Sequence, residues 1–231
     1  MDLEAHYGFL DIQARNQVLE EGFGFDRLID DPGDSRRGLT LLLRPGQELA
    51  ESFGRFTDAV KQVVPGHHLY GPLDFHVTVI PIISCYSGFS LEGVSIGEYL
   101  PLIDASIQGI GRISIRFRGV FMSPSCLMIK GYPEDGELEK LRESLRRSFA
   151  GSSLEQSLDK RYKLVTAHST VVRFKHAVEN QEAVLEVLDR FSGYEFGVQA
   201  FHEVEFVFND WYQRAGLVKL LASFPLLANP S

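Results

Sequence analysis

The 231-residue sequence has little cysteine and no long apolar run. Its two cysteines, Cys85 and Cys126, are too few for a disulfide framework, and no Cys/His spacing typical of structural zinc accompanies them. No apolar stretch reaches the roughly 18 residues that cross a bilayer, and the N-terminus lacks a basic segment before an apolar one. These absences favour a globular protein of a reducing compartment, which we expect to be cytoplasmic and to have no membrane contact.

Three common enzyme signatures are also missing. Gly109-Ile110-Gly111 lacks the third glycine of a dinucleotide-binding loop, no Gly-Lys-Ser/Thr is present, and no Gly-x-Ser-x-Gly elbow of a serine hydrolase occurs. His67 and His68 have no histidine partner four residues away, so they give little support to a metal site. We therefore expect neither a metal nor a cofactor.

The net charge of −8 is concentrated near the N-terminus. Residues 1–35 hold nine acidic residues against Arg15 and Arg27, and the rest of the chain is close to neutral. Between residues 159 and 175 the one acidic residue is Asp159, and the sequence has a local cluster of bases made of Lys160, Arg161, Lys163, Arg173 and Lys175. The cluster is compatible with a phosphate-bearing ligand and equally with a solvated loop.

Hydrophobic periodicity predicts an α+β fold. A helix over 5–21 and an acidic loop make residues 1–37 an N-terminal extension, and residues 38–231 form the main domain. Strands are expected over 38–43, 75–83, 113–121, 127–132, 165–174, 196–208 and 217–221, and helices over 48–64, 96–108, 137–149 and 182–191. The order strand, helix, strand, helix, strand occurs twice. We therefore expect two pseudo-symmetric lobes, each an antiparallel-rich sheet backed by helices, with a central cleft.

Two His-x-Thr triplets occur at equivalent steps of these halves. They are His76-Val77-Thr78 and His168-Ser169-Thr170, both within apolar, β-branched runs. On a strand, residues i and i+2 point to the same face, so each histidine projects beside its threonine. Seven histidines and five threonines placed at random would give about 0.15 such triplets, so chance is a poor explanation for two.

Two histidines that face one cleft are suited to phosphoester chemistry. One imidazole can deprotonate an incoming oxygen while the other protonates the leaving oxygen, because histidine titrates near neutral pH. The hydroxyls of Thr78 and Thr170 can donate hydrogen bonds to the non-bridging phosphate oxygens. The opposing interpretation is that each histidine is a buried strand residue whose polar atoms are satisfied by neighbours.

The chain resembles the two-histidine (2H) phosphoesterase superfamily, which includes 2′-5′ RNA ligase-like proteins and cyclic phosphodiesterases. The resemblance rests on the two triplets, on the apolar pair and Arg173 after the second, and on the order of elements from about residue 38 to 226. It implies metal-independent catalysis by His76, Thr78, His168 and Thr170. The sequence departs from the family pattern at Ala167, where proline is frequent, and at Ser169, where an apolar residue is frequent.

Further residues are candidates for substrate binding. Arg173 lies five positions after His168 and so on the opposite strand face, unless the strand ends or bends there, in which case it contacts phosphate. Aromatic residues flank the expected cleft strands, and of these we select Tyr162 for stacking on a base. His202 alternates with apolar residues, which predicts a core histidine.

The function that we expect is opening of 2′,3′-cyclic phosphates on nucleotides or RNA ends by a monomeric, metal-independent phosphodiesterase. The alternatives are a non-catalytic module that binds a nucleotide or RNA terminus in the same cleft, and an RNA 2′-5′ ligase-type activity. A metal hydrolase would need further carboxylate or histidine ligands, which the two motifs do not offer.

Overall fold

The computed structural model describes residues 2–160 and 162–227. It begins with helix α1 (Leu3–Glu21), where the Asp2 side chain accepts hydrogen bonds from the backbone N–H groups of Glu4 and Ala5. The helix ends at Gly22, whose φ of 80° favours glycine. The helix predicted over 5–21 is therefore present and begins two residues earlier.

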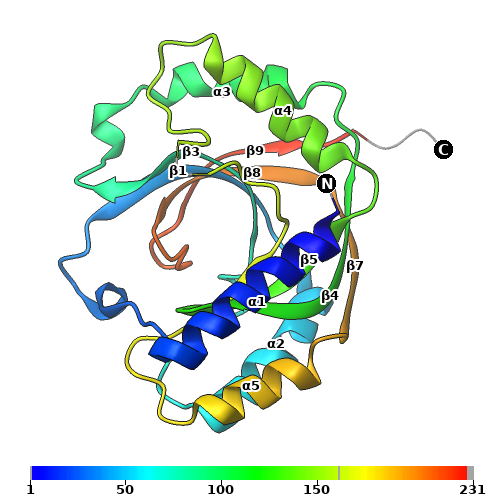
Figure 1. Ribbon diagram of the computed structural model, residues 1–231. Coiled ribbons are helices and arrows are strands. Elements are labelled where there is room, and N and C mark those ends of the chain that lie inside the picture. The colour runs from blue at the N-terminus through cyan, green and yellow to red at the C-terminus, as the bar shows by residue number, and fades with distance from the viewer. Residues whose placement is uncertain (1, 161, 228–231) are drawn as a thin grey trace.

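Two antiparallel sheets form the centre of the described part of the chain (Figure 1). Sheet A has the strand order β3 (Val77–Ser87), β1 (Arg36–Leu43), β8 (Glu203–Asp210) and β9 (Lys219–Pro225). Sheet B has the order β2 (His68–Leu69), β6 (Ser169–Arg173), β5 (Cys126–Pro133), β4 (Ile113–Ser123) and β7 (Glu195–Phe201). The α+β class with two antiparallel-rich sheets is confirmed.

Helices cover the outer sides of both sheets (Figure 1). Helices α3 (Ile96–Ile107) and α4 (Glu137–Ala150) lie over sheet A, while α2 (Gln47–Val63) and α5 (Gln181–Arg190) lie over sheet B. The apolar stripe of α2 brings Phe53 against Phe117 of β4 with ring centroids 5.2 Å apart. Burial of the apolar sides of these helices against the outer faces of the sheets holds both sheets in place. The inner faces of the sheets remain available to the site.

Each sheet draws strands from both halves of the sequence. Strand β4 belongs to the first half but pairs in sheet B, whereas β8 and β9 belong to the second half and pair in sheet A. The repeated order of elements indicated two sheets, but it carries no information about this exchange of strands.

The strand predicted over 196–208 is wrong, because the chain forms two strands in different sheets there. It leaves sheet B at Phe201 and enters sheet A at Glu203. Between them lies His202, which is exposed and whose carbonyl accepts a hydrogen bond from the N–H of Leu226. His202 is therefore not the core histidine that the alternation of apolar residues predicts.

A bulge in β4 decides where α1 packs. The pairing of β4 with β5 shifts register around Gly119, which has a φ of 71°. The extra residue reverses the alternation of side chains, so Phe117 faces Phe53 of α2 whereas Phe121 faces Tyr7 of α1 at 4.8 Å. Helix α1 therefore lies on the opposite face of sheet B from α2, the face that the site also uses.

Candidate functional site

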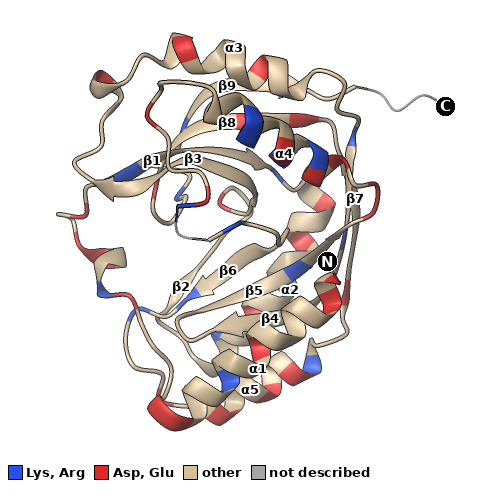
Figure 2. Ribbon diagram, turned by 45° about the horizontal axis from the view of Figure 1, so that its top comes forward, with Lys and Arg blue, Asp and Glu red and all other residues tan. Residues whose placement is uncertain are grey.

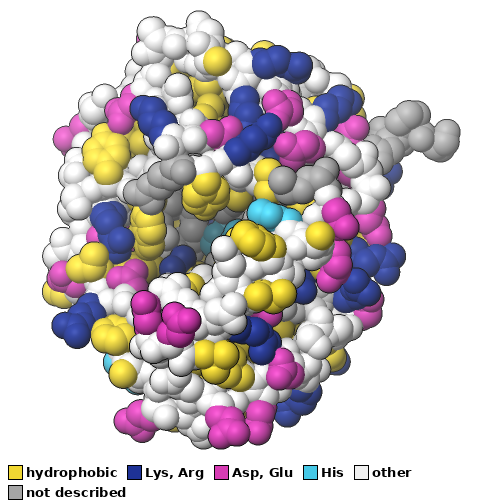
Figure 3. Space-filling model, viewed as in Figure 1, with side chains coloured by type: hydrophobic (Ala, Val, Ile, Leu, Met, Phe, Trp, Pro, Cys, Tyr) yellow, Lys and Arg dark blue, Asp and Glu magenta, His cyan; other side chains and the backbone are white. Residues whose placement is uncertain are grey.

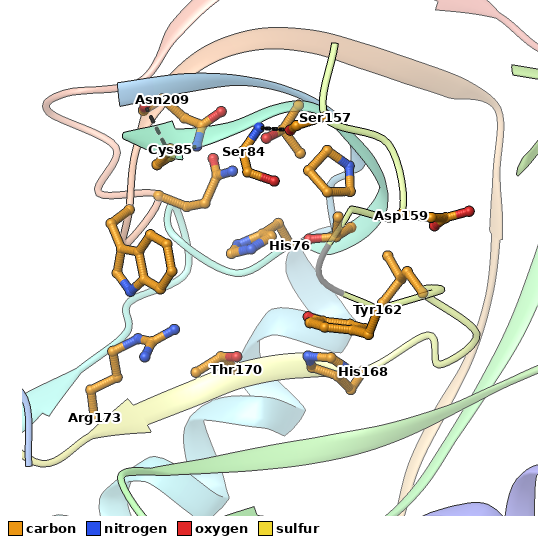
Figure 4. A pocket seen from close by; sticks show the side chains of 16 residues that line it. His76, Ser84, Cys85, Ser157, Asp159, Tyr162, His168, Thr170, Arg173 and Asn209 are labelled. Carbon is orange, nitrogen blue, oxygen red and sulfur yellow. Dashed lines mark hydrogen bonds between the residues drawn. The ribbon is translucent and has the colours of Figure 1, made fainter. Parts of the chain in front are cut away.

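A cavity of about 220 Å³ lies between the two sheets. Its lining includes all six residues that the sequence analysis selected, which are His76, Thr78, Tyr162, His168, Thr170 and Arg173. Figure 3 shows histidine side chains at the edge of a hollow in the molecular surface, and Figure 4 shows the interior of the cavity. His76 and His168, which are 92 positions apart in the sequence, thus line the same cavity.

The two histidines occupy equivalent places at the start of strands. His76 directly precedes β3, and His168 directly precedes β6, so each lies one step outside the strand in which it was predicted. Extended backbone still places each histidine beside the threonine two residues later. In Figure 4, His76 and His168 enter from opposite sides of the cavity, and Thr170 follows His168 along β6.

The Nδ1 atoms of both rings are occupied, but by different partners. Nδ1 of His76 lies 2.8 Å from the carbonyl oxygen of Asp74, so it carries a hydrogen that it donates to that oxygen. Nδ1 of His168 lies 2.8 Å from the hydroxyl of Thr166, which can either donate or accept. The Nε2 atom of each ring is left for a ligand.

Burial lowers the pKa of both histidines. Loss of hydration is the largest cause and brings the pKa of His76 to about 4, although the hydrogen bond to the Asp74 carbonyl opposes the shift. Loss of hydration also brings the pKa of His168 to about 4, with a further decrease from the charge of His76. In the ligand-free protein at neutral pH both rings are therefore neutral, and a bound phosphate anion favours their protonated forms.

Arg173 reaches the cavity because β6 contains a bulge. Leu127 of β5 pairs with Val172 and Met128 pairs with Thr170, so Val171 is an extra residue on β6. The extra residue turns Arg173 to the same side as Thr170, which strict alternation did not predict. The Nε of Arg173 donates to the hydroxyl of Tyr70 at 2.9 Å, and this bond holds the guanidinium at the cavity.

The other members of the predicted basic cluster do not gather around the cavity. Lys163 pairs with Glu143 at 2.8 Å, and Lys175 pairs with Asp30 at 2.6 Å, so both charges are already compensated. Arg161 lies outside the described residues. Tyr162, in contrast, lines the cavity with 68% of its side chain exposed, and Figure 4 shows its ring close to His168.

A buried arginine connects the two motifs behind the cavity. Arg142 of α4 is 1% exposed and donates to the carbonyl oxygens of Val79, Thr78 and Thr166 at 2.8, 3.0 and 2.7 Å. Burial lowers its pKa to about 10, which still leaves the guanidinium charged at neutral pH. Since Thr78 belongs to sheet A and Thr166 precedes β6, Arg142 fixes the spacing between the two histidine motifs. Nothing in the helical pattern of 137–149 distinguished it.

Helix α1 supports the second motif through Tyr7, whose ring is fully buried. Its hydroxyl accepts from the N–H of Ala167 at 3.1 Å and donates to the carbonyl of Gly131 at 3.1 Å. Gly131 has no room for a side chain, because a Cβ there would clash with the Ala167 carbonyl. Tyr7 thereby satisfies the N–H of the residue immediately before His168 and a carbonyl of the neighbouring strand β5.

The cavity also contains residues that the sequence analysis missed. They come from β1, β3, the loop before Asp159, the end of β8 and the turn that follows it, and they include Thr40, Ser84, Ser157, Asn209, Trp211 and Gln213. Trp211 is the single tryptophan of the chain and directly follows an apolar strand. The position of Trp211 directly after a strand was the one signal in the sequence that could have indicated a missed cavity residue. The other missed residues are of types that are common in any turn.

In residues 2–160 and 162–227, no cluster of three or more His, Cys, Asp or Glu side chains is arranged to hold a metal ion. Within the same residues, none of the helices combines the length and the apolar character needed to cross a membrane.

Comparisons with known proteins place the fold. No family model and no curated protein matches the sequence. Among solved structures, the TT0787 protein of Thermus thermophilus is 18% identical with a TM-score of 0.60, over 84% of this chain and all of that one. LigT of E. coli in complex with 3′-AMP and a protein described as a phosphoesterase are 13% and 14% identical, both with a TM-score of 0.56, over 83% of this chain and 98% of theirs. The fold that the His-x-Thr resemblance implied is thus confirmed.

Proposed function

We propose that this chain is a phosphodiesterase that opens 2′,3′-cyclic phosphates of nucleotides or RNA ends by acid–base catalysis between His76 and His168. The observation that carries the proposal is their arrangement: each ring has its Nδ1 engaged and both line one cavity with Thr78, Thr170 and Arg173. A phosphate between the rings receives an acid and a base from opposite sides, as in-line displacement requires.

The different Nδ1 partners divide the roles. Because Nδ1 of His76 donates to a carbonyl, its neutral ring has a bare Nε2, which accepts the proton of the attacking water. Bound phosphate favours the protonated form of His168, and the hydroxyl of Thr166 can accept from its Nδ1–H, so its Nε2–H serves the leaving ribose oxygen. As water attacks phosphorus and the P–O bond to the ribose breaks, neutral His76 takes one proton and becomes cationic, while cationic His168 delivers another and becomes neutral.

The remaining polar residues fit the charge that develops at phosphorus. The hydroxyls of Thr78 and Thr170 and the guanidinium of Arg173 are donors for the non-bridging oxygens. The likeness to a LigT structure that contains 3′-AMP agrees with a nucleotide as ligand. No metal is required for any of these steps, because side chains supply the acid, the base and the donors.

The test is incubation of the protein with 2′,3′-cyclic nucleotides in EDTA, with identification of the phosphate position in the product. We expect opening that His76→Ala and His168→Ala each reduce by about 10²- to 10⁴-fold, the usual contribution of a general acid or base. His202→Ala is the matched control, since this histidine is exposed and outside the cavity, and it leaves the rate unchanged.

Two results contradict the proposal. Loss of turnover in EDTA, with recovery on adding a divalent metal, shows a metal-dependent reaction instead. Binding of a nucleotide that is weakened in His168→Ala, without turnover of any cyclic phosphate by the wild-type protein, identifies a binding module that uses the same cavity.

A further inference from the structure

A second and larger hollow meets the catalytic cavity. This α1 groove, about 1130 Å³ in volume, lies between helix α1, the turn that joins β4 to β5, and residues 162–166. Its lining includes His168, Thr170, Arg173 and Tyr162, which also line the catalytic cavity, but not His76. The two hollows therefore join at the second histidine motif.

The floor and the wall of the α1 groove differ in chemistry. The floor is apolar and includes Phe121, whose ring makes an edge contact with His168 at 5.7 Å, together with Met122 and Met128. The wall is one face of α1, which presents Gln13 and Gln17 with further polar residues. These floor side chains are nearly buried, but Tyr162, which is 68% exposed at the junction with the catalytic cavity, offers a ring for stacking. An exposed aromatic ring beside amides for hydrogen bonding is the combination that single-stranded bases use.

Most of the acidic side chains on α1 are paired or lie outside the groove. The helix carries several acidic residues (Figure 2), but Glu4 bonds Arg118 and Tyr132, and Asp11 bonds Arg15 and the N–H of Met122. Among the groove residues Glu20 is the single acid, Arg173 is basic, and the charge of Lys163 is compensated by Glu143. A chain of bases with phosphates between them therefore meets little repulsion there.

The size of the groove sets the length of its occupant. The catalytic cavity has room for a phosphate and its immediate surroundings, while the groove exceeds the roughly 300–1,000 Å³ of a small-molecule site. The groove opens on the side of His168, which under the proposed roles protonates the leaving ribose oxygen. The nucleoside that bears this oxygen, and those that precede it, are thus directed into the groove.

We infer that the α1 groove binds the last nucleosides of a single-stranded RNA whose terminal 2′,3′-cyclic phosphate lies between His76 and His168. The inference rests on the proposed function and makes the substrate an oligonucleotide end rather than a mononucleotide. Helix α1 then has two tasks: Tyr7 supports the catalytic strand, and the face with Leu10 and Gln13 forms the wall that contacts RNA.

The experiment compares a mononucleotide with a trinucleotide of the same 3′-terminal nucleoside, in two assays. The first measures kcat/KM for opening of the terminal 2′,3′-cyclic phosphate. The second measures affinity for the same molecules with an open terminal 3′-phosphate, by calorimetry, and needs no turnover. We expect the trinucleotide to be preferred at least tenfold in both assays, because each stacked base adds favourable contact.

Leu10→Trp narrows the groove, and Ile12→Trp is its matched control on the outer face of the same helix, where Ile12 is 61% exposed. We expect Leu10→Trp to abolish the preference for the trinucleotide, with a smaller effect on the mononucleotide, while Ile12→Trp alters neither. The double variant Gln13→Ala/Gln17→Ala changes exposed positions only, so it tests the wall without endangering the fold, with an expected loss of about threefold for the trinucleotide alone.

Each outcome separates the inference from the proposed function. Equal values for the two lengths, or equal effects of Leu10→Trp and Ile12→Trp, overturn the α1 groove as an RNA site even if cyclic phosphates are opened. A length preference in affinity that Leu10→Trp removes, without opening of either substrate, supports the groove and contradicts the phosphodiesterase. A loss of the same factor for both lengths in Leu10→Trp shows that narrowing the groove does not act selectively on the longer substrate, and it overturns the inference.

Discussion

The two His-x-Thr motifs have the same sequence pattern and the same start-of-strand position, but their surroundings differ. The ring of His76 is held by a backbone carbonyl of its own loop, that of Asp74. The ring of His168 is held by a side-chain hydroxyl, that of Thr166, and its strand is supported by Tyr7 from α1. Both ring partners lie two residues before their histidine, but one is a backbone carbonyl and the other a side-chain hydroxyl, and the second motif is also supported from a distant part of the chain by Tyr7.

Under the proposed function, this difference gives the repeated motif two roles. A carbonyl can only accept, so the hydrogen of neutral His76 stays on Nδ1 and its Nε2 is free to accept a proton. A hydroxyl can accept from the Nδ1–H of protonated His168, which leaves its Nε2–H as the proposed acid. The α1 groove is lined by His168 and not by His76, so the inferred RNA lies on the side of the proposed acid.

The largest expected effect tests the assignment of acid and base. In a nucleoside phosphodiester that carries a nitrophenyl group, the nitrophenolate leaves as a stable anion. Its departure therefore needs no proton from the enzyme. With this substrate we expect His168→Ala to stay within about tenfold of the wild type, whereas His76→Ala still loses about 10²- to 10⁴-fold. Release of nitrophenolate, followed by absorbance, measures both.

A double variant completes this test. Groups that act as a unit are not additive, so on a cyclic phosphate His76→Ala/His168→Ala should be about as slow as either single variant. Rescue of His76→Ala, rather than His168→Ala, by the nitrophenyl ester would reverse the two roles.

The sequence predicts the two His-x-Thr motifs better than the residues that support them. The spacing of His76 from Thr78 and of His168 from Thr170 determines a shared face on any extended backbone, so these residues could be identified without a structure. Arg173 reaches the cavity through a bulge at Val171, which period-two reasoning cannot anticipate. Long-range partners leave no local signal at all, and therefore Arg142 was missed.

The second prediction removes the connection between the motifs. Arg142→Lys keeps the charge but cannot reach the carbonyls of Thr78, Val79 and Thr166 together, so the two rings lose their fixed separation. We expect kcat to fall by about 10²-fold, as a displacement of about 1 Å does, with a smaller change in KM. Steady-state kinetics at a temperature where the variant is folded provide the measurement.

Arg142→Met serves as the contrast for this residue. It leaves three buried carbonyls without their donor, and we expect it to lower the free energy of unfolding by about 3 kcal/mol or more, measured by denaturant titration. An Arg142→Lys protein with wild-type kcat would show that the spacing of the motifs does not depend on the guanidinium.

The third prediction concerns pH and uses both rings together. Because burial lowers the pKa of His76 and of His168 to about 4, each ring of the free protein loses its imidazolium proton as pH rises above that value, and the acid form of His168 is lost with it. We therefore expect kcat/KM to decrease by up to about tenfold per pH unit on the alkaline side. Bound phosphate favours the protonated forms, so the optimum of kcat lies at higher pH than that of kcat/KM. Coincident optima in the two pH profiles would contradict this account.

The smallest expected effect isolates the hydroxyl that distinguishes the second motif. Thr166→Val keeps the shape of a buried side chain but removes the hydroxyl bonded to Nδ1 of His168, while the Thr166 carbonyl remains available to Arg142. The protonated ring then has an Nδ1–H without an acceptor, which disfavours the acid form of His168, and we expect kcat for a cyclic phosphate to fall by about tenfold. Thr166→Ser restores the hydroxyl and should restore the rate. Because the nitrophenyl ester needs no acid, Thr166→Val should leave its turnover unchanged; an equal loss on both substrates would mean that Thr166 holds the position of His168 rather than its hydrogen.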